Sequence, residues 1–258
     1  RLMLADLRSA GFDVLALNHA EAILSHDFPD ELGGLVAALR AFRVGIAEMI
    51  GGGGGESGQT RRLRHALTDA GWHKHKFGVL TIVDGFERAS ISHEVDHVRF
   101  ARNGRLALEI EWNNKDPFFD RDLENFKRLH ALSAISLGII VTRGRSLQEA
   151  LLPRIRSWME AQGLASEDDL DRLGISERTT TQRRAVAAQV ARGTSFAEAF
   201  ARKFVADKFG AASTHWSKLE DRVSRGVGNP CPLLLIGLPE GTLSDATPQL
   251  PPEPDLFA

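Results

Sequence analysis

The amino-acid sequence predicts an α/β domain, and three observations favour this fold class. Apolar residues at helical spacing early in the chain give way, from Phe77 onward, to the alternation typical of β-strands. A predicted strand at 106–112 precedes an amphipathic segment at 118–133 and a wholly apolar segment at 137–141, the order of a strand–helix–strand crossover in a mixed sheet. The 258-residue chain is 43% hydrophobic, enough for one large core. We therefore expect a single domain over residues 1–246, with a central mixed β-sheet flanked by helices.

The first 50 residues are predicted to be helical, because their apolar side chains recur at spacings of three and four. Asn18 is a candidate N-cap for one of these helices. The apolar positions are Leu2, Leu4, Leu7, Ala20, Ile23, Leu24, Leu32, Leu35, Val36, Leu39 and Phe42.

A Gly-rich loop is predicted at 51–58, where the consecutive glycines Gly51–Gly55 exclude a stable helix. The loop is not a P-loop, because no Gly-Lys-Ser/Thr sequence follows the glycines. Both a mobile loop and a loop ordered by contact with DNA fit this composition. A helical pattern resumes over Thr60–Ala70.

A β-meander is predicted in the middle of the chain. The strands are Val79–Val83, Ala89–Val98 and Leu106–Trp112, and the turns between them are Asp84-Gly85 and Asn103-Gly104. The following segments are predicted to be a helix at Ser146–Gln162, an acidic segment capped by Ser166, a helix-forming run from the threonines at 179–181 to Lys208, a buried strand at Leu233–Leu238 and a disordered Pro-rich tail at 247–258.

Two carboxylates share one face of the third predicted strand. Side chains alternate along a strand, so Glu109 and Glu111 lie side by side while Leu108 and Ile110 point the other way. Neighbouring carboxylates repel one another, and a divalent cation held jointly with Asp96 would offset that repulsion. A solvated sheet edge is the alternative for a Glu-x-Glu pattern, but the apolar flanks and the crossover favour the sheet centre.

This pattern indicates metal-assisted phosphodiester hydrolysis. Asp96 and Glu109 are the predicted metal ligands, and the Ile110 carbonyl is a plausible third oxygen donor. Glu111 is then placed to orient or deprotonate the attacking water. Mg²⁺ is the expected ion, because all these donors are hard oxygens.

Five segments together resemble the type II restriction endonucleases of the BglII/BamHI-like group, within the PD-(D/E)xK nuclease superfamily. They are Asn18–Leu24, Val95–His97, Leu108–Asn114, Ile139–Gly144 and Pro232–Gly237. The resemblance runs from about residue 14 to about residue 240 and implies the PD-(D/E)xK restriction-endonuclease-like core. It implies an Mg²⁺-dependent enzyme that cuts both strands of double-stranded DNA at a short palindrome as a homodimer.

The chain also departs from the family pattern. Glu111 stands where most PD-(D/E)xK nucleases carry Lys, which leaves the identity of the general base open. Lys74 and Lys76 lie upstream and either supply a cation or face solvent. The segment 165–213 is expected to be a helical insertion relative to the family.

Candidate DNA contacts follow the two central strands. The polar residues directly after the catalytic strand are suited to base contacts, and asparagine can bind adenine with two hydrogen bonds; a turn or helix cap is the alternative. Arginines after the next strand could reach phosphate or guanine. The predicted DNA-binding residues are Asn113, Asn114, Lys115, Arg143 and Arg145, and Arg183 and Arg184 are candidates for phosphate or dimer contacts.

Composition narrows the remaining possibilities. Arginine outnumbers lysine among the 32 basic residues, which suits DNA, although a GC-rich genome would give the same bias. The single cysteine, Cys231, excludes a disulfide framework, and no apolar stretch is long enough for a membrane helix, so a cytoplasmic protein is expected. Two rival functions stay open: a less specific or modification-dependent PD-(D/E)xK nuclease, and a catalytically silent DNA-binding module of the same fold.

Overall fold

The computed structural model describes residues 3–51, 58–175 and 178–246. Most of the predicted Gly-rich loop and the predicted disordered tail lie outside these described residues.

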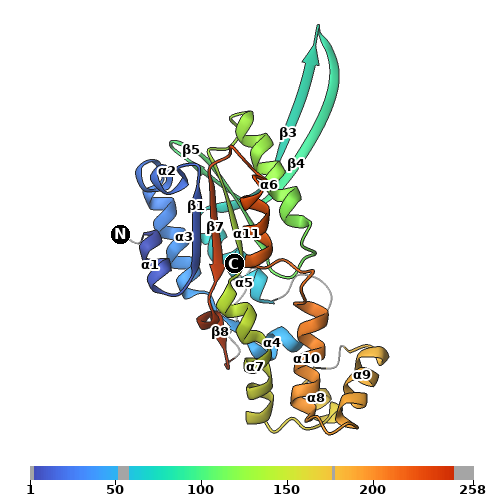
Figure 1. Ribbon diagram of the computed structural model, residues 1–258. Helices are drawn as coiled ribbons and strands as arrows, with labels where there is room; N and C mark the ends of the chain where they lie inside the picture. Colours follow the sequence, from blue (N-terminus) through green and yellow to red (C-terminus); the bar gives the residue numbers. More distant parts are fainter. Residues whose placement is uncertain (1–2, 52–57, 176–177, 247–258) are drawn as a thin grey trace, which may run out of the picture.

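A six-stranded mixed sheet forms the centre of the molecule (Figure 1). The strand order is β1-β7-β6-β5-β4-β3, with β5, β6 and β7 parallel and the other neighbours antiparallel. The strands are β1 (Asp13–Leu17), β3 (Trp72–Val83), β4 (Phe86–Ala101), β5 (Gly104–Glu111), β6 (Leu137–Arg143) and β7 (Leu233–Leu238). The predicted meander, crossover and last strand are therefore confirmed.

The prediction of an all-helical N-terminus is wrong at two points. Strand β1 interrupts it and pairs with β7, and the short strand β2 (Val44–Gly45) interrupts it again. Asn18 does not cap a helix. It adopts a positive φ of 52° after β1, and its side-chain amide donates to the Cys231 carbonyl at 2.8 Å. Asn18 therefore fastens the end of β1 to the segment that precedes β7.

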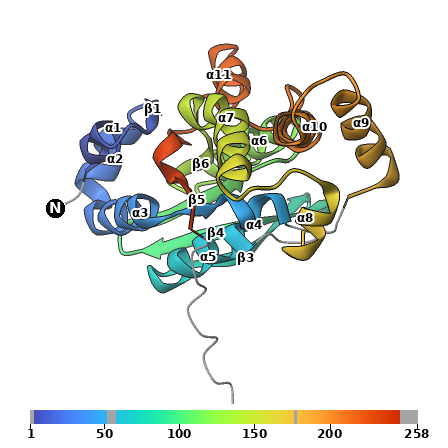
Figure 2. The ribbon, with the colours of Figure 1, turned by 90° about the horizontal axis from the view of Figure 1, so that it is seen from below.

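Helices cover both faces of the sheet (Figure 2). Alternate residues of each central strand enter different cores. Leu106, Leu108 and Ile139 pack with the N-terminal helices, whereas Ala107 and Ile140 pack under the helices at Phe118–Ala131 and Trp216–Ser224. The helices and short elements up to α7 are α1 (Leu4–Ser9), α2 (Ala20–Asp27), α3 (Pro29–Ala41), β2 (Val44–Gly45), α4 (Ile46–Gly51), α5 (Gly58–Asp69), α6 (Phe118–Ala131) and α7 (Arg145–Ala161). Near the C-terminus lie α11 (Trp216–Ser224), η1 (Glu240–Thr242) and β8 (Leu243–Ser244).

The segment 165–213 folds as three short helices: α8 (Glu167–Arg172), α9 (Thr180–Val190) and α10 (Phe196–Lys208). The Ser166 hydroxyl accepts a hydrogen bond from the Asp169 N–H, as predicted for an N-cap. The single helical run predicted as far as Lys208 is wrong. It breaks at Gly193, which has a φ of 94°, and Ser195 caps the next helix.

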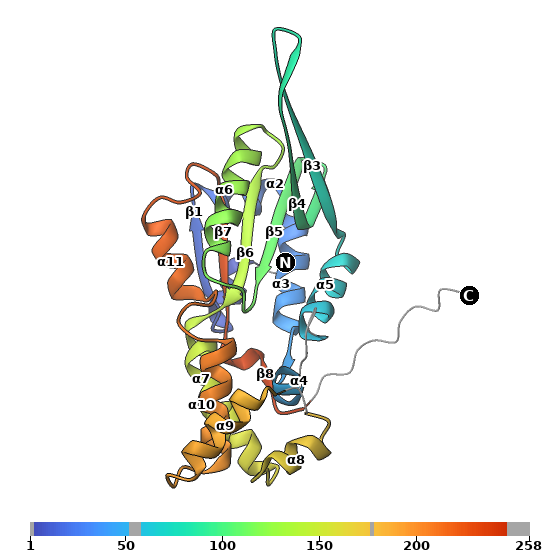
Figure 3. The same cartoon turned by 90° about the vertical axis from the view of Figure 1, so that its right-hand side faces the viewer.

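Strands β3 and β4 form a long hairpin that projects from the body of the molecule (Figure 3). Its tip is the predicted Asp84-Gly85 turn, where both residues have positive φ, 53° and 80°. This geometry matches a two-residue hairpin turn, in which glycine relieves the backbone strain.

Candidate active site

A β-bulge places Asp96 beside the central strand. His73 pairs with Val98 and His75 with Val95, so two residues of β4, Asp96 and His97, lie opposite one residue of β3. Bulges of this kind bend a strand and re-aim its side chains, and they are common next to active sites. Here the backbone N–H of Asp96 donates a hydrogen bond to the carboxylate of Glu109. The structure therefore brings Asp96 and Glu109 together.

Glu109 and Glu111 lie on the face of β5 that α6 covers. Both side chains are buried, Glu111 with only 2% of its surface exposed. Burial, together with the nearby charges of Asp122 and Asp96, raises the pKa of Glu109 to about 9. The surroundings of Glu109 among the described residues thus favour its protonated form, and a cation would be needed to favour the charged one.

Asp122 is a third buried carboxylate that sequence reasoning did not identify. It lies on α6 with 2% of its surface exposed and accepts a hydrogen bond from Arg121 Nε at 2.8 Å. Its other oxygen, Oδ2, is buried and accepts no hydrogen bond from an N–H or hydroxyl group among the described residues. One signal could have revealed it: Asp122 occupies the apolar stripe of α6, three residues after Phe119 and four before Phe126.

Glu111 forms the centre of a polar cluster. Asn114 Nδ2 donates to Glu111 Oε2 at 2.7 Å, and Arg121 Nη2 lies 3.6 Å from Glu111 Oε1. Glu111 and Asp122 also share a hydrogen bond, which requires a proton on one of them. Burial raises the pKa of both carboxyls, and their mutual repulsion adds to the effect on Glu111.

A groove of about 380 Å³ opens beside the bulge. Residues from α5, β3, β4 and β5 line it: Thr60, Arg64, Thr68, His73, Lys74, Asp96, His97 and Ile110. Lys74 Nζ lies 2.6 Å from Glu94 Oε1 and 3.7 Å from Asp96 Oδ1. The Asp96 side chain is 61% exposed, so solvent reaches this carboxylate. Ile110 and Asp96 border the same space.

The predicted base-contacting residues Asn113, Asn114 and Lys115 are exposed, directly after β5. The Asn114 amide is engaged with Glu111, and its carbonyl accepts a hydrogen bond from the Thr214 N–H at 2.8 Å. Asn114 therefore holds the Glu111 carboxylate in place by a hydrogen bond and is also exposed to solvent.

The two arginines after β6 differ in position. Arg143 is fully buried, and its guanidinium donates to the carbonyls of Trp112 and Thr214 at 2.7 and 2.6 Å and to the Ser213 hydroxyl at 2.7 Å. This position contradicts the prediction that Arg143 contacts DNA: β6 runs two residues further than expected and keeps Arg143 inside the fold.

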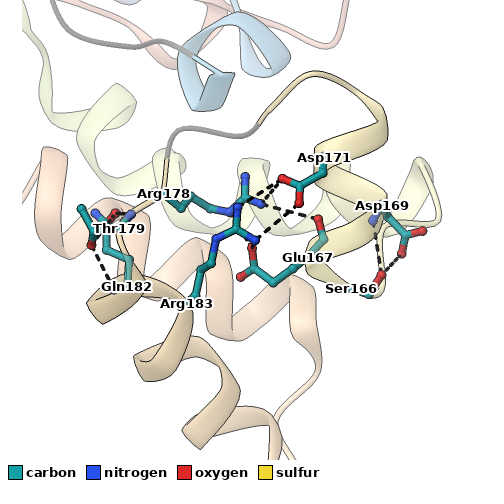
Figure 4. Close-up of polar contacts among 8 residues, drawn as sticks. All are labelled: Ser166, Glu167, Asp169, Asp171, Arg178, Thr179, Gln182 and Arg183. Carbon is teal, nitrogen blue, oxygen red and sulfur yellow. Dashed lines mark hydrogen bonds and ion pairs between the residues drawn. The ribbon is translucent and has the colours of Figure 1, made fainter.

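Arg145 is half-exposed and pairs with Glu220, and it lies 3.5 Å from Asp13. In segment 165–213, Arg183 lies within ion-pair distance of Glu167 and Asp171 (Figure 4), and Arg184 is exposed. Arg145 and Arg184 thus lie at the surface.

A metal ion suits these residues by the chemistry of their oxygens. Over the described ranges, no group of three or more His, Cys, Asp or Glu side chains meets a metal-holding geometry. The set predicted from sequence consists of two carboxylates and a backbone carbonyl. Asp122 Oδ2 is an additional buried oxygen that accepts no N–H or hydroxyl hydrogen bond among the described residues. Hard oxygens around uncompensated negative charge are the donors that Mg²⁺ takes.

The chain was also compared with known proteins. The model of the family "Restriction endonuclease BglII/BglIII" matches residues 12–238, which include the whole central sheet and all the carboxylates of the site. A search of curated proteins found no match. None of the described helices is long and apolar enough to cross a membrane. The match covers most of the chain, and the chain therefore belongs to the BglII/BglIII family of restriction endonucleases.

Proposed function

We propose that the protein is an Mg²⁺-dependent type II restriction endonuclease that cuts both strands of double-stranded DNA at a short palindromic sequence. The observation that carries the proposal is the meeting of Asp96 and Glu109 at the β4 bulge, next to the buried pair Glu111 and Asp122. Burying three carboxyls side by side costs free energy, because their charges lose hydration and repel one another. A bound cation would offset this cost.

Asp96, Glu109 and the Ile110 carbonyl would hold the metal. When bound, Mg²⁺ neutralises charge on the scissile phosphate and promotes formation of the attacking hydroxide. The Asp96 N–H fixes the orientation of the Glu109 carboxylate, and the exposed Asp96 side chain faces the groove from which a phosphate would approach. Restriction endonucleases generally use Mg²⁺, in agreement with this assignment.

Glu111 is the residue that accepts a proton from the attacking water. Burial and Asp122 raise its pKa to about 8, within about one unit of the pH near 7 at which a general base would work. The Asn114 N–H holds one carboxylate oxygen, Oε2, and Asp122 hydrogen-bonds the same side chain. These contacts fix the direction in which Glu111 presents its free lone pairs.

DNA contacts in this proposal come from Asn113, Asn114, Lys115 and Arg145, all at the surface near the carboxyl ends of β5 and β6. Arg143 is buried and is not one of them. A homodimer would present two such sites to a two-fold symmetric duplex, as cleavage of both strands of a palindrome requires.

The proposal is tested by digesting plasmid DNA in Mg²⁺ and sequencing the ends. Discrete termini at one palindrome are expected, with none in EDTA. Random termini would identify a less specific nuclease, and DNA binding without cleavage would identify a silent module; either result would contradict the proposal.

A further inference from the structure

The outer part of the β3–β4 hairpin, residues 78–92, is here called the arm. It projects beyond the helices and the other strands (Figures 1 and 3). Large apolar side chains on it are exposed to solvent: Leu80 by 55%, Ile82 by 59% and Phe86 by 67%. A two-stranded hairpin alone is marginally stable in water, and contiguous exposed apolar residues mark interaction sites. The arm therefore has the properties of a segment that packs against another surface.

Strand β3 is also the last strand of the sheet, so one side of its backbone has no neighbouring strand among the described residues. Its two halves differ in charge. The inner half carries Lys74 and Lys76, which discourage pairing at an exposed edge, whereas Phe77–Val83 contains no charged residue and no proline. The outer half of β3 thus lacks the features that protect edge strands from pairing.

The net charge of the arm is unfavourable for binding DNA. Its charged residues are Asp84, Glu87 and Arg88, which leaves a slight negative excess. A segment that binds the phosphate backbone needs an excess of Lys and Arg. An uncharged apolar edge is instead complementary to another copy of itself, because two identical strands can pair antiparallel across a two-fold axis.

We propose that the arm docks on the arm of a second copy of this chain, with the outer halves of the two β3 strands paired antiparallel. This inference rests on the homodimer in the proposed function and assigns its contact surface. Leu80 and Ile82 alternate along β3 and share one face, so the two-fold axis brings them close to the same residues of the second copy.

The experiment uses full-length protein without DNA or metal, with mass measured by light scattering during gel filtration. One double variant carries Leu80→Lys and Ile82→Lys, and the other carries Leu80→Glu and Ile82→Glu. Like charges facing each other across the axis should weaken self-association at least tenfold in each variant alone. An equimolar mixture should recover the dimer, because Lys then faces Glu.

Leu173→Lys is the matched control, because Leu173 is 53% exposed but lies on segment 165–213, away from the arm. It should remain a dimer. The proposal is overturned if the wild-type protein is monomeric, if either double variant stays dimeric, or if the mixture does not associate. Dimers that persist while DNA affinity falls would assign the arm to DNA instead. Cleavage assays on the same samples report on the nuclease separately, since mass is measured without substrate.

Discussion

The carboxylates of segment 165–213 and those beneath α6 differ in how many basic partners they have. In the first region, Glu167 and Asp171 accept from Arg178 at 2.6 and 2.8 Å, and Arg183 lies 3.3 Å from Asp171 (Figure 4). These arginines hold the pKa of Asp171 below its usual range. Every acid drawn there has a partner within the chain.

Beneath α6 the acids outnumber their partners. Glu109, Glu111 and Asp122 all have raised pKa values, and Arg121 is the cation that reaches two of them. The comparison indicates that carboxylates with a structural role in this chain are paired with arginine. Carboxylates that lack enough arginine partners can instead bind a cation from solution.

The largest expected effect is on cleavage. Glu109→Gln removes a proposed metal ligand with little change in shape and should lower cleavage about 1,000-fold, since metal-assisted stabilisation is worth several kcal/mol. DNA binding by gel shift should persist. Glu167→Gln is the matched control from the arginine-paired region and should cut normally. Equal loss of cleavage in both variants would remove the distinction between the two regions.

A second prediction concerns Arg143, a buried cation held by neutral oxygens rather than acids. Arg143→Met leaves the carbonyls of Trp112 and Thr214 unsatisfied, so the free energy of unfolding in urea should fall by about 3 kcal/mol. Cleavage per folded molecule should change little below the unfolding transition. Normal stability with lost DNA binding would instead restore Arg143 as a DNA contact.

A third prediction uses the raised pKa of Glu109. Between its ordinary value of 4.5 and about 9, folded Glu109 retains a proton that the unfolded chain has released, so stability falls as pH rises through this window. In EDTA, Glu109→Gln should therefore match the wild-type stability at pH 4 and exceed it by roughly 2 kcal/mol at pH 8.

Asp171→Asn should change the stability at pH 8 in the opposite direction. Because the pKa of Asp171 is lowered, its stabilising contribution is present above its ordinary pKa and is lost as the pH falls through its folded value. The variant should thus be less stable than the wild type at pH 8.

Mg²⁺ should raise the unfolding temperature of the wild type but not of Glu109→Gln. If Glu109→Gln destabilises at pH 8 in EDTA, Glu109 is already compensated within the fold.

Much of this architecture was predictable, because it depends on local patterns. The alternation around Glu109 and Glu111 and the crossover to β6 follow from periodicity, and both are present. Strand β1 was missed because five residues, Asp13–Leu17, fit helical and extended patterns alike, and pairing with the distant β7 decides between them.

The site itself was only partly predictable. In the sequence alone Asp122 is like any solvent-exposed acidic residue of a helix, and only the packing of α6 on β5 shows that it is buried. The bulge at Asp96 depends on the register between β4 and β3. Arg143 was misassigned because the extra length of β6 comes from pairing with β7, which continues to Leu238. In each case a contact far away in the sequence sets the outcome.

The smallest expected effect separates two roles of Asn114. Its amide stabilises the charged form of Glu111 and so lowers the pKa of that carboxyl. With Asn114→Ala, the acidic limb of the kcat/KM profile should move to higher pH by less than about one unit, since one such hydrogen bond contributes about 1 kcal/mol. A base-contacting Asn114 would instead change KM or sequence preference and leave the profile in place. Asn113→Ala, which lacks the contact with Glu111 among the described interactions, is the control and should not move the limb. A shift in both variants would mean that the loop, rather than the hydrogen bond, tunes Glu111.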